Sequence, residues 1–346
     1  MTMTLDTTQT APGRTSAAAG AGPVLRVEDL SVTYYTDLGR ARALDSVGFT
    51  LEAGLKMGMV GESGSGKSTL ALAMMRMIKP PGRIEGGKVI VGGTDLQSLS
   101  DEGMRKARLS KIAYIPQGAM NSLNPVTRIG AQMVDAIKSH LPGESRKAIN
   151  DRCVWALRSV DLDPSVFHMY AHELSGGMKQ RVCIAIGILL RPEVIIADEP
   201  TSALDVVTQR QVMETINKVQ DDIGAAVILI GHDMGLMAQT MDKVAVMYAG
   251  RLVEVATVRE MFTDPKHPYS QALISSLPTL DNRGKFQGIP GLAPALHRLP
   301  TGCAFHPRCP HGQGEKQRSV RPPSVTLPSG RVVACHLYSD EGHAHE

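Results

Sequence analysis

Residue types suited to chemistry on phosphate groups gather in one glycine-rich segment. Residues 61–68 read GESGSGKS, match the pattern G-x-x-x-x-G-K-[ST], and follow the apolar run MGMV at 57–60. In such a segment the glycines let successive backbone N–H groups converge on phosphate oxygens, and a helix that starts near the lysine adds the positive end of its dipole. The sequence therefore predicts a strand, a phosphate-binding loop and a helix. A chance match in an ordinary loop is the weaker alternative.

The loop residues have distinct expected roles at a nucleoside triphosphate. Lys67 would hold the β- and γ-phosphates, Ser68 would ligate Mg²⁺ through its hydroxyl, and Thr69 would contact another phosphate. We expect the nucleotide to be contacted by consecutive residues of this segment, which are Gly61, Glu62, Ser63, Gly64, Ser65, Gly66, Lys67, Ser68 and Thr69.

Two adjacent carboxylates end a second apolar run. Residues 194–197 read VIIA, which is typical of a strand buried on both faces of a parallel sheet, and Asp198 and Glu199 follow them. At the carboxyl end of such a strand, Asp198 could hold Mg²⁺ through water. Glu199 could orient or deprotonate the water that attacks the γ-phosphate. Such a pair seen alone is more often a solvated turn, but the phosphate-binding loop favours hydrolysis.

Three further side chains follow strand-like segments and could complete the site. His232 could sense the γ-phosphate, Gln117 could reach Mg²⁺ and the attacking water, and Tyr34 could stack its ring on adenine. The alternatives are an ordinary core or surface histidine and a polar loop residue. For the aromatic contact, the alternatives are Tyr35 or plain packing.

A glycine-containing segment with its own phosphate chemistry lies between the loop and the acidic pair. Residues 174–181 read LSGGMKQR, and Ser175, Gly176 and Gly177 open a predicted helix, so their N–H groups and the helix dipole suit a γ-phosphate. With all of these motifs in this order, the chain resembles the nucleotide-binding subunit of an ABC transporter over roughly residues 25–260.

This resemblance implies a fold, a ligand and a role for each motif. It implies a P-loop NTPase core of the RecA type with an antiparallel β subdomain and an inserted α-helical subdomain, binding ATP and Mg²⁺. In the family, two cassettes close around two nucleotides, and the signature and D-loop of one subunit contact ATP on the other. The corresponding segments here are Walker A at 61–69, the Q-loop glutamine Gln117, the signature residues Ser175, Gly176 and Gly177, the Walker B end Asp198-Glu199, the D-loop at 202–205 with Asp205, and the switch histidine His232.

Three other segments carry a narrower resemblance. NSLNP at 121–125, HPYSQAL at 267–273 and GCAFHPRCP at 302–310 resemble the oligopeptide, dipeptide and nickel importer ATPases. That subfamily usually works as two different ATPase subunits beneath two different membrane subunits, fed by a solute-binding protein. The resemblance implies a peripheral subunit at the cytoplasmic face of the inner (plasma) membrane that hydrolyses ATP to import peptides. Oligosaccharide or nickel uptake by the same mechanism is the alternative cargo.

Composition is consistent with this class and disfavours others. The chain has 346 residues, 42% of them hydrophobic, which is enough for one large core and a smaller appendage. Lys and Arg total 37 against 34 Asp and Glu, with no basic block, so nucleic-acid binding has little support. No apolar run approaches the roughly 18 residues of a membrane span. The first residues also lack the apolar core of a signal peptide.

We divide the chain into three parts. Residues 1–22 are rich in Thr, Ala and Gly and are expected to form a disordered tail. Residues 23–262 are expected to form the nucleotide-binding domain, with the helical subdomain at about 125–182. Residues 263–346, where Pro, His and Gly increase, are expected to form a C-terminal extension.

The helical subdomain shows helix-compatible patterns at 129–140, 146–160 and 164–172. By the family resemblance, a groove between this subdomain and the catalytic core receives short helices of the membrane subunits, and the Q-loop links that groove to ATP. Most apolar residues here, including Trp155, Leu157 and Met169, are expected to pack internally.

Cysteines raise the question of a metal or cluster. Cys153 and Cys183 lie in helical patterns and are expected to be buried thiols. Cys303, Cys309 and Cys335 lie in the extension, and their uneven spacing in a cytosolic chain argues against disulfides. An iron–sulfur cluster or zinc on these three thiolates is therefore the sharper hypothesis, and an empty structural set is the alternative.

The extension departs from its relatives at one cysteine. The related importers often show four cysteines, whereas this chain has Lys316 where the third would be expected. A fourth ligand would have to come from outside the chain or from a histidine, with His306, His311 and His336 as the candidates.

Two other classes of function compete with transport. A soluble ABC ATPase of translation or DNA maintenance would usually bring tandem cassettes or a long coiled-coil insertion, and this sequence has one cassette and neither feature. A non-hydrolytic regulatory subunit is disfavoured by Glu199 and His232.

Overall fold

The computed structural model describes residues 22–118, 121–202, 204–277 and 288–339. Its strands form two sheets. The smaller sheet contains β1 (Leu25–Thr36), β2 (Gly39–Leu51), β4 (Gly82–Val91) and β5 (Thr94–Asp95). The larger sheet contains β3 (Lys56–Val60), β6 (Ile112–Ile115), β7 (Val194–Asp198), β8 (Ala226–Ile230), β9 (Lys243–Tyr248), β10 (Arg251–Thr257), β11 (Val325–Thr326) and β12 (Val332–Val333).

Strand order separates the two sheets by type. The smaller sheet has the order β2-β1-β4-β5 and is antiparallel throughout. The larger has the order β11-β12-β10-β9-β3-β8-β7-β6, and its segment from β9 to β6 is parallel. The expected α/β fold, with a parallel core sheet and an antiparallel β subdomain, is confirmed.

The central strands are buried on both faces because their side chains alternate between two cores. Every residue of β3, β7 and β8 is buried. Ile196 and Ile228 pack into the core shared with the antiparallel sheet and the first helix, whereas Ile195 and Val227 pack into the core on the opposite face. This alternation accounts for the unbroken apolar runs in the sequence.

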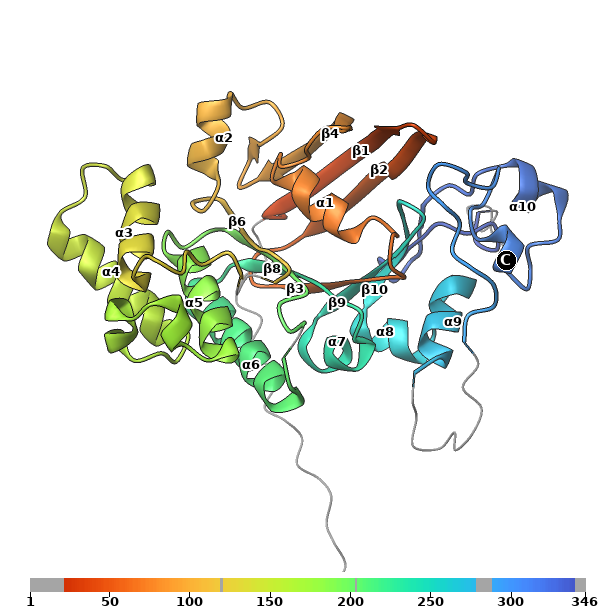
Figure 1. The fold of residues 1–346 in the computed structure, drawn as a ribbon. Helices are drawn as coiled ribbons and strands as arrows, with labels where there is room; N and C mark the ends of the chain where they lie inside the picture. Colours follow the sequence, from red (N-terminus) through yellow and green to blue (C-terminus); the bar gives the residue numbers. More distant parts are fainter. Residues whose placement is uncertain (1–21, 119–120, 203, 278–287, 340–346) are drawn as a thin grey trace, which may run out of the picture.

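Helices cover the faces and ends of the larger sheet. They are α1 (Lys67–Met74), α2 (Asp101–Ala107), α3 (Ile129–His140), α4 (Arg146–Ser159), α5 (Gly176–Ile188), α6 (Val206–Ile223), α7 (Met234–Thr240), α8 (Val258–Thr263), α9 (Pro268–Ser275) and α10 (Glu315–Ser319). In Figure 1, α1 lies between the two sheets, α3 to α5 lie at one end of the molecule, and α8 to α10 lie at the other. No helix of the described residues is long and apolar enough to cross a membrane.

The helical insertion follows the predicted pattern except at its third segment. The bounds of α3 agree with the expected helix, and α4 ends one residue earlier than expected. The segment 164–172 is not an α-helix but two short 3-10 turns, Pro164–His168 and Ala171–Glu173. Met169 and Tyr170 have extended backbones between the turns, and Ile129 donates its N–H to the Met169 carbonyl at 2.9 Å. The pairing with the start of α3 therefore interrupts the helix.

The expected internal packing of this insertion is confirmed. Leu157 is fully buried, and Trp155 and Met169 pack against the same apolar core. The guanidinium group of Arg191 lies over the Trp155 ring, with its carbon 4.4 Å from the ring centroid.

The C-terminal segment is joined to the larger sheet through a shared edge. Strand β12 pairs antiparallel with β10 and with β11, so residues beyond 320 continue the sheet of the catalytic core. Arg331 is 4% exposed and lies within 4 Å of the carboxylates of Glu254, Glu260 and Asp264. Of the expected tail at residues 1–22, all but Gly22 lies outside the described residues.

A buried histidine gives this region a pH dependence that can be measured. His267 caps α9, and its Nδ1 accepts the Tyr269 N–H at 3.0 Å. Burial lowers the pKa of His267 to about 3, from an ordinary value near ~6.5. Between these values the unfolded chain binds a proton that the folded chain does not. The free energy of unfolding should therefore fall as pH falls below ~6.5, with a slope from this group that approaches about 1.4 kcal/mol per pH unit about one unit lower.

The substitution His267→Asn tests this dependence, because asparagine also caps helices but does not titrate. We expect the loss of unfolding free energy between pH 6.5 and 5.5 to be about 1 kcal/mol smaller in the variant than in the wild type, because the unfolded histidine is only half protonated at pH 6.5. Denaturant titrations at the two pH values measure it. The exposed His297 gives the matched control His297→Asn. If the free energy of unfolding depended equally on pH in all three proteins, the buried neutral ring of His267 would not be the cause of the dependence.

Candidate functional site

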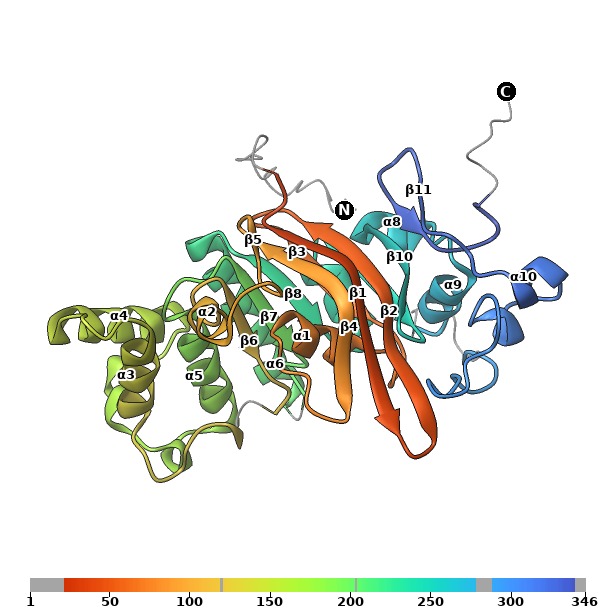
Figure 2. The same cartoon turned by 90° about the horizontal axis from the view of Figure 1, so that it is seen from above.

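The predicted site residues come together at one edge of the parallel sheet. In the order β3-β8-β7-β6, the strands run side by side in one direction, so their carboxyl ends share an edge. The phosphate-binding loop follows β3, and His232 follows β8. Asp198 is the last residue of β7, Glu199 comes directly after it, and Gln117 follows β6. Figure 2 shows these strands adjacent beneath the antiparallel sheet. Ligand sites of open α/β sheets form at this edge.

Two loop positions require glycine for steric reasons. Gly61 has a φ of +148°, and a Cβ there would lie 2.2 Å from the carbonyl oxygen of Met247 in β9. Gly66 has a φ of +107°, and its Cβ would lie 2.5 Å from the carbonyl oxygen of Ala43 in β2. Any side chain at either position would push the loop off the sheet that supports it.

Lys67 begins α1 and folds back over the loop. Its Nζ donates hydrogen bonds to the carbonyl oxygens of Gly61 at 2.8 Å and Glu62 at 3.0 Å. Burial lowers the pKa of Lys67, while the charges of Glu199 and Asp198 oppose that shift. The ammonium group is thus held in the loop by backbone carbonyl groups, close to the carboxylates of Glu199 and Asp198.

Asp198 is 1% exposed and receives two hydroxyl donors. Ser68 donates to its Oδ1 at 3.2 Å, and Tyr114 of β6 donates to its Oδ2 at 3.1 Å. Burial raises the pKa of Asp198, and the two hydroxyl donors act against that rise. The Ser68 hydroxyl, the Asp198 carboxylate and the nearby Gln117 amide offer the oxygen donors that Mg²⁺ prefers, so the residues present fit this ion.

Tyr114 was missed by sequence reasoning because nothing in the strand pattern distinguishes it from a packing residue. We expect Tyr114→Phe to raise the Mg²⁺ concentration for half-maximal ATP hydrolysis by about fivefold, since one hydrogen bond to a charged group contributes roughly 1 kcal/mol or more. A Mg²⁺ titration of hydrolysis by the assembled complex measures this. Tyr35→Phe is the matched control, because the Tyr35 hydroxyl donates to Glu85 at 2.9 Å. Identical Mg²⁺ dependence in both variants would exclude a role for Tyr114.

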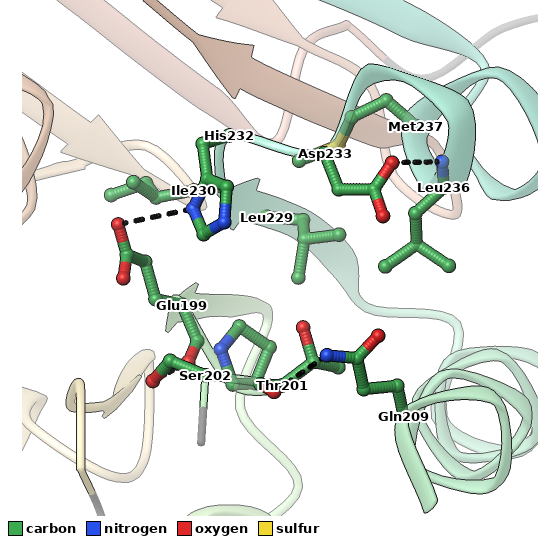
Figure 3. Close-up of a pocket in the computed structure, with 12 residues that line it drawn as sticks. Glu199, Thr201, Ser202, Gln209, Leu229, Ile230, His232, Asp233, Leu236 and Met237 are labelled. Carbon is green, nitrogen blue, oxygen red and sulfur yellow. Dashed lines mark hydrogen bonds and ion pairs between the residues drawn. The ribbon is translucent and has the colours of Figure 1, made fainter. Parts of the chain in front are cut away.

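Glu199 stands between two polar side chains from neighbouring strands. Gln117 donates from Nε2 to Glu199 Oε2 at 2.7 Å, and His232 Nδ1 lies 3.7 Å from Glu199 Oε1. Figure 3 shows the Glu199 carboxylate and the His232 ring facing each other among the residues that line a pocket. Glu199 has a φ of +45°, an uncommon conformation for a residue with a side chain, and its N–H donates to the Ile230 carbonyl at 2.9 Å.

A cavity of 430 Å³ joins the phosphate loop to these residues. Tyr34 lies within β1, not after a strand as expected, and it lines the cavity, whereas Tyr35 is not among the lining residues. Leu296 from the C-terminal segment also lines it, which sequence reasoning did not anticipate. The lining residues are Tyr34, Ala43, Gly61, Ser63, Gly64, Gly66, Lys67, Ser68, Thr69, Gln117, Glu199, His232 and Leu296.

None of the described signature and D-loop residues lines this cavity. Ser175 caps α5, where its hydroxyl accepts the Met178 N–H at 3.3 Å, and Gly177 packs so close to α6 that a Cβ would lie 2.6 Å from Thr208. Asp205 caps α6 and accepts the Thr208 N–H at 3.0 Å. Gly176 is the first residue of α5. Within the described part of the chain, the cavity lining includes none of these residues. Ala203 of the D-loop is not among the described residues.

The cysteines divide as their positions suggested. Cys153 and Cys183 are buried, and burial raises the pKa of each thiol to about 11. Cys303, Cys309 and Cys335 line one small pocket together with His306, His311 and His336. Among the residues that the structure describes, no group of three or more His, Cys, Asp or Glu side chains could hold a metal ion. The cluster or zinc hypothesis therefore gains no support from the geometry.

Comparison with known proteins places these features in a class. The family model for the ABC transporter matches residues 44–202, and the model for the oligopeptide/dipeptide transporter C-terminal region matches residues 253–315. The dimeric post-hydrolysis structure of the ATP-binding cassette MJ0796 bound to ADP and Pi is similar in fold. Its TM-score is 0.60 at 24% identity, over 68% of this chain and 99% of that one. The fold and site thus define an ATP-binding cassette ATPase.

The full-length relatives narrow the class. The chain is 42% identical to the oligopeptide transport ATP-binding protein OppD of Salmonella typhimurium over 93% of this chain and 96% of the relative. It is 39% identical to the dipeptide transport ATP-binding protein DppD of Escherichia coli over 92% of this chain and 98% of the relative. The chain belongs to the family of oligopeptide and dipeptide transport ATP-binding proteins.

Proposed function

We propose that this chain is the ATP-hydrolysing subunit of an importer for peptides. The observation that carries hydrolysis is the Glu199 carboxylate, held between Gln117 and His232 beside the phosphate-binding loop. The cargo class follows from the names of the relatives, which are oligopeptide and dipeptide transport proteins. We further propose residues 23–262 as the nucleotide-binding domain and residues 263–346 as the extension.

The predicted site residues have distinct roles in the proposed reaction. Lys67 and the loop N–H groups bind the β- and γ-phosphates, and Tyr34 stacks on adenine. Ser68, Asp198 and Gln117 would hold Mg²⁺, which would neutralise phosphate charge when bound. Glu199 accepts a proton from water while the water oxygen bonds to the γ-phosphorus and the bond to the ADP oxygen breaks. His232, beside Glu199, contacts the γ-phosphate.

The reaction requires a second cassette. Ser175, Gly176, Gly177 and Asp205 do not line the cavity built on Lys67, which supports their use at the ATP site of a partner subunit. The partner's own signature would then complete the site of this chain. We propose that the partner is a different ATPase subunit, and that the isolated chain hydrolyses ATP poorly because its site lacks that second half.

Coupling to transport uses partner proteins in the membrane. We propose a peripheral position at the cytoplasmic face of the plasma membrane, beneath two permease subunits that a solute-binding protein supplies. The helical subdomain at about 125–182 would dock the permeases, and Gln117 would link docking to the nucleotide. Nucleic acid has no place in this proposal, and neither does a metal at Cys303, Cys309 or Cys335.

Uptake by whole cells tests this function and its direction. Cells lacking the gene should accumulate a radiolabelled tripeptide at a lower rate, and the wild-type gene should restore it while the Glu199→Gln gene should not. Labelled maltotriose and nickel serve as the comparison solutes. Loss of oligosaccharide or nickel uptake with unchanged peptide uptake would contradict the peptide assignment, and unchanged uptake of all three would contradict import.

A further inference from the structure

The phosphate-binding loop is hydrogen-bonded to a residue that lies 246 positions away in the sequence. Arg308, in the C-terminal extension, donates from Nη1 to Glu62 Oε2 at 2.7 Å and from Nη2 to Glu62 Oε1 at 2.9 Å. Glu62 is the second residue of the loop. The two hydrogen bonds form a bidentate fork, the geometry in which arginine binds a carboxylate most strongly.

Contacts other than those with Glu62 also hold the guanidinium group of Arg308 in place. The Arg308 side chain is 5% exposed, and its Nε donates to the Pro290 carbonyl at 2.7 Å. Its Nη1 also donates to the Tyr248 hydroxyl at 3.3 Å, and the guanidinium lies 5.9 Å from the Phe305 ring centroid. The hydrogen bonds that Arg308 donates to the Glu62 carboxylate raise the pKa of Arg308 above its ordinary value. The charge is therefore permanent and held in place.

A second contact from the extension holds the backbone of the same loop residue. The Glu62 N–H donates to the hydroxyl of Tyr269 at 2.8 Å. Tyr269 is fully buried in α9 and packs against Tyr248 and Phe305, with ring centroids 4.6 Å and 5.3 Å away. Lys67 donates to the Glu62 carbonyl. Glu62 is thus held at its N–H, its carbonyl and its carboxylate, and the first and last of these contacts come from the extension.

Charge gives the arrangement a consequence for nucleotide binding. Burial lowers the pKa of Lys67, the cation that would meet the phosphates, and the nearby carboxylate of Glu62 is one of the charges that oppose this shift. Without Arg308, this carboxylate would be an unpaired negative charge beside a negatively charged ligand. The loop would also lose a restraint on its shape. This loss matters because several of its glycines adopt positive φ and gain much conformational freedom when the loop is released.

We propose that Arg308 and Tyr269 are positioning residues, through which the C-terminal extension holds the phosphate-binding loop in its nucleotide-binding shape. We call the pair, with Glu62, the loop clamp. This inference rests on the proposed function, because the ligand is ATP. It adds that the extension is part of the nucleotide site, a view that the lining of the cavity by Leu296 supports.

Nucleotide binding by the purified full-length chain tests the clamp. We expect Arg308→Gln to raise the Kd for Mg-ATP about tenfold, and Tyr269→Phe to raise it about threefold, by equilibrium dialysis with radiolabelled ATP. Arg308→Lys should recover only part of the affinity, because an ammonium cannot form the fork. The double variant Glu62→Gln/Arg308→Gln should bind ATP no more weakly than Arg308→Gln, because it removes the unpaired carboxylate as well.

A second readout separates positioning from general loss of stability. Hydrogen exchange of the nucleotide-free chain should be faster in peptides covering residues 61–66 of Arg308→Gln and unchanged in β7. Arg321→Gln is the matched control, because Arg321 also joins the extension to the core, through Asp45 at 2.6 Å. We expect wild-type affinity and loop exchange in this control. If Arg308→Gln yields little folded protein, Tyr269→Phe, which loses one hydroxyl, carries the test.

The outcomes distinguish the clamp from the function on which it rests. Wild-type affinity and wild-type loop exchange in Arg308→Gln and Tyr269→Phe would overturn the clamp and leave the proposed function standing. Equal weakening in Arg321→Gln would also overturn it, because the effect would then be general. Failure of the wild-type chain to bind Mg-ATP would overturn the proposed function and this inference together.

Discussion

Glu199→Gln is expected to leave ATP binding intact and to lower steady-state hydrolysis by the assembled complex about 10²- to 10⁴-fold, the range typical of a lost general base. The amide keeps the size of the carboxylate and can still meet Gln117, which donates to Glu199 at 2.7 Å. It cannot accept the proton of the attacking water. Phosphate release and ATP binding, measured on the same preparation, separate the chemical step from affinity.

The control for this variant lies at the other end of the same strand. Glu193 precedes β7 and pairs with Lys111 at 3.0 Å, away from the carboxyl edge of the sheet. Glu193→Gln should hydrolyse ATP at the wild-type rate. Undiminished turnover in Glu199→Gln would remove Glu199 from the proposed chemistry.

Lys67→Met should weaken ATP binding about 100-fold, because a charge-assisted contact to phosphate contributes up to roughly 3 kcal/mol. Methionine keeps the length of the side chain, but it cannot donate to phosphate or to the loop carbonyls that Lys67 now contacts. Equilibrium dialysis with radiolabelled ATP measures the Kd, and circular dichroism verifies that the variant is folded.

Lys243→Met provides the matched comparison. Lys243 begins β9 at the amino edge of the parallel sheet, where it pairs with Glu52 at 2.9 Å. Its loss should leave the Kd for ATP unchanged. Equal affinity of Lys67→Met and the wild type would show that the loop binds its ligand without the lysine.

Local sequence patterns were sufficient to predict the central part of the site. The apolar runs of β7 and β8 predicted buried parallel strands, and such strands must end at a common edge. Gln117, Glu199 and His232 could therefore be expected to meet although up to 115 residues separate them, and they lie together in the structure. Their chemical roles stay predictions until the variants are measured.

Contacts that depend on tertiary packing could not be predicted in this way. The bidentate contact between Arg308 and Glu62 joins two segments that are far apart in the sequence. No local sequence pattern indicates that they meet. The Tyr114 hydroxyl reaches Asp198 only because β6 and β7 are paired in one register. The helix expected at 164–172 failed because backbone pairing with the start of α3 outweighed helical propensity over a short segment.

The most direct test of the account is to isolate the native complex through a tag on this chain and to measure its composition and ATP hydrolysis. We predict two multispan membrane proteins and a second, non-identical ATPase subunit. The complex should hydrolyse ATP, and the isolated chain should bind ATP but turn it over slowly. Recovery of the chain without membrane proteins, or full hydrolysis by the isolated chain alone, would contradict the central claim.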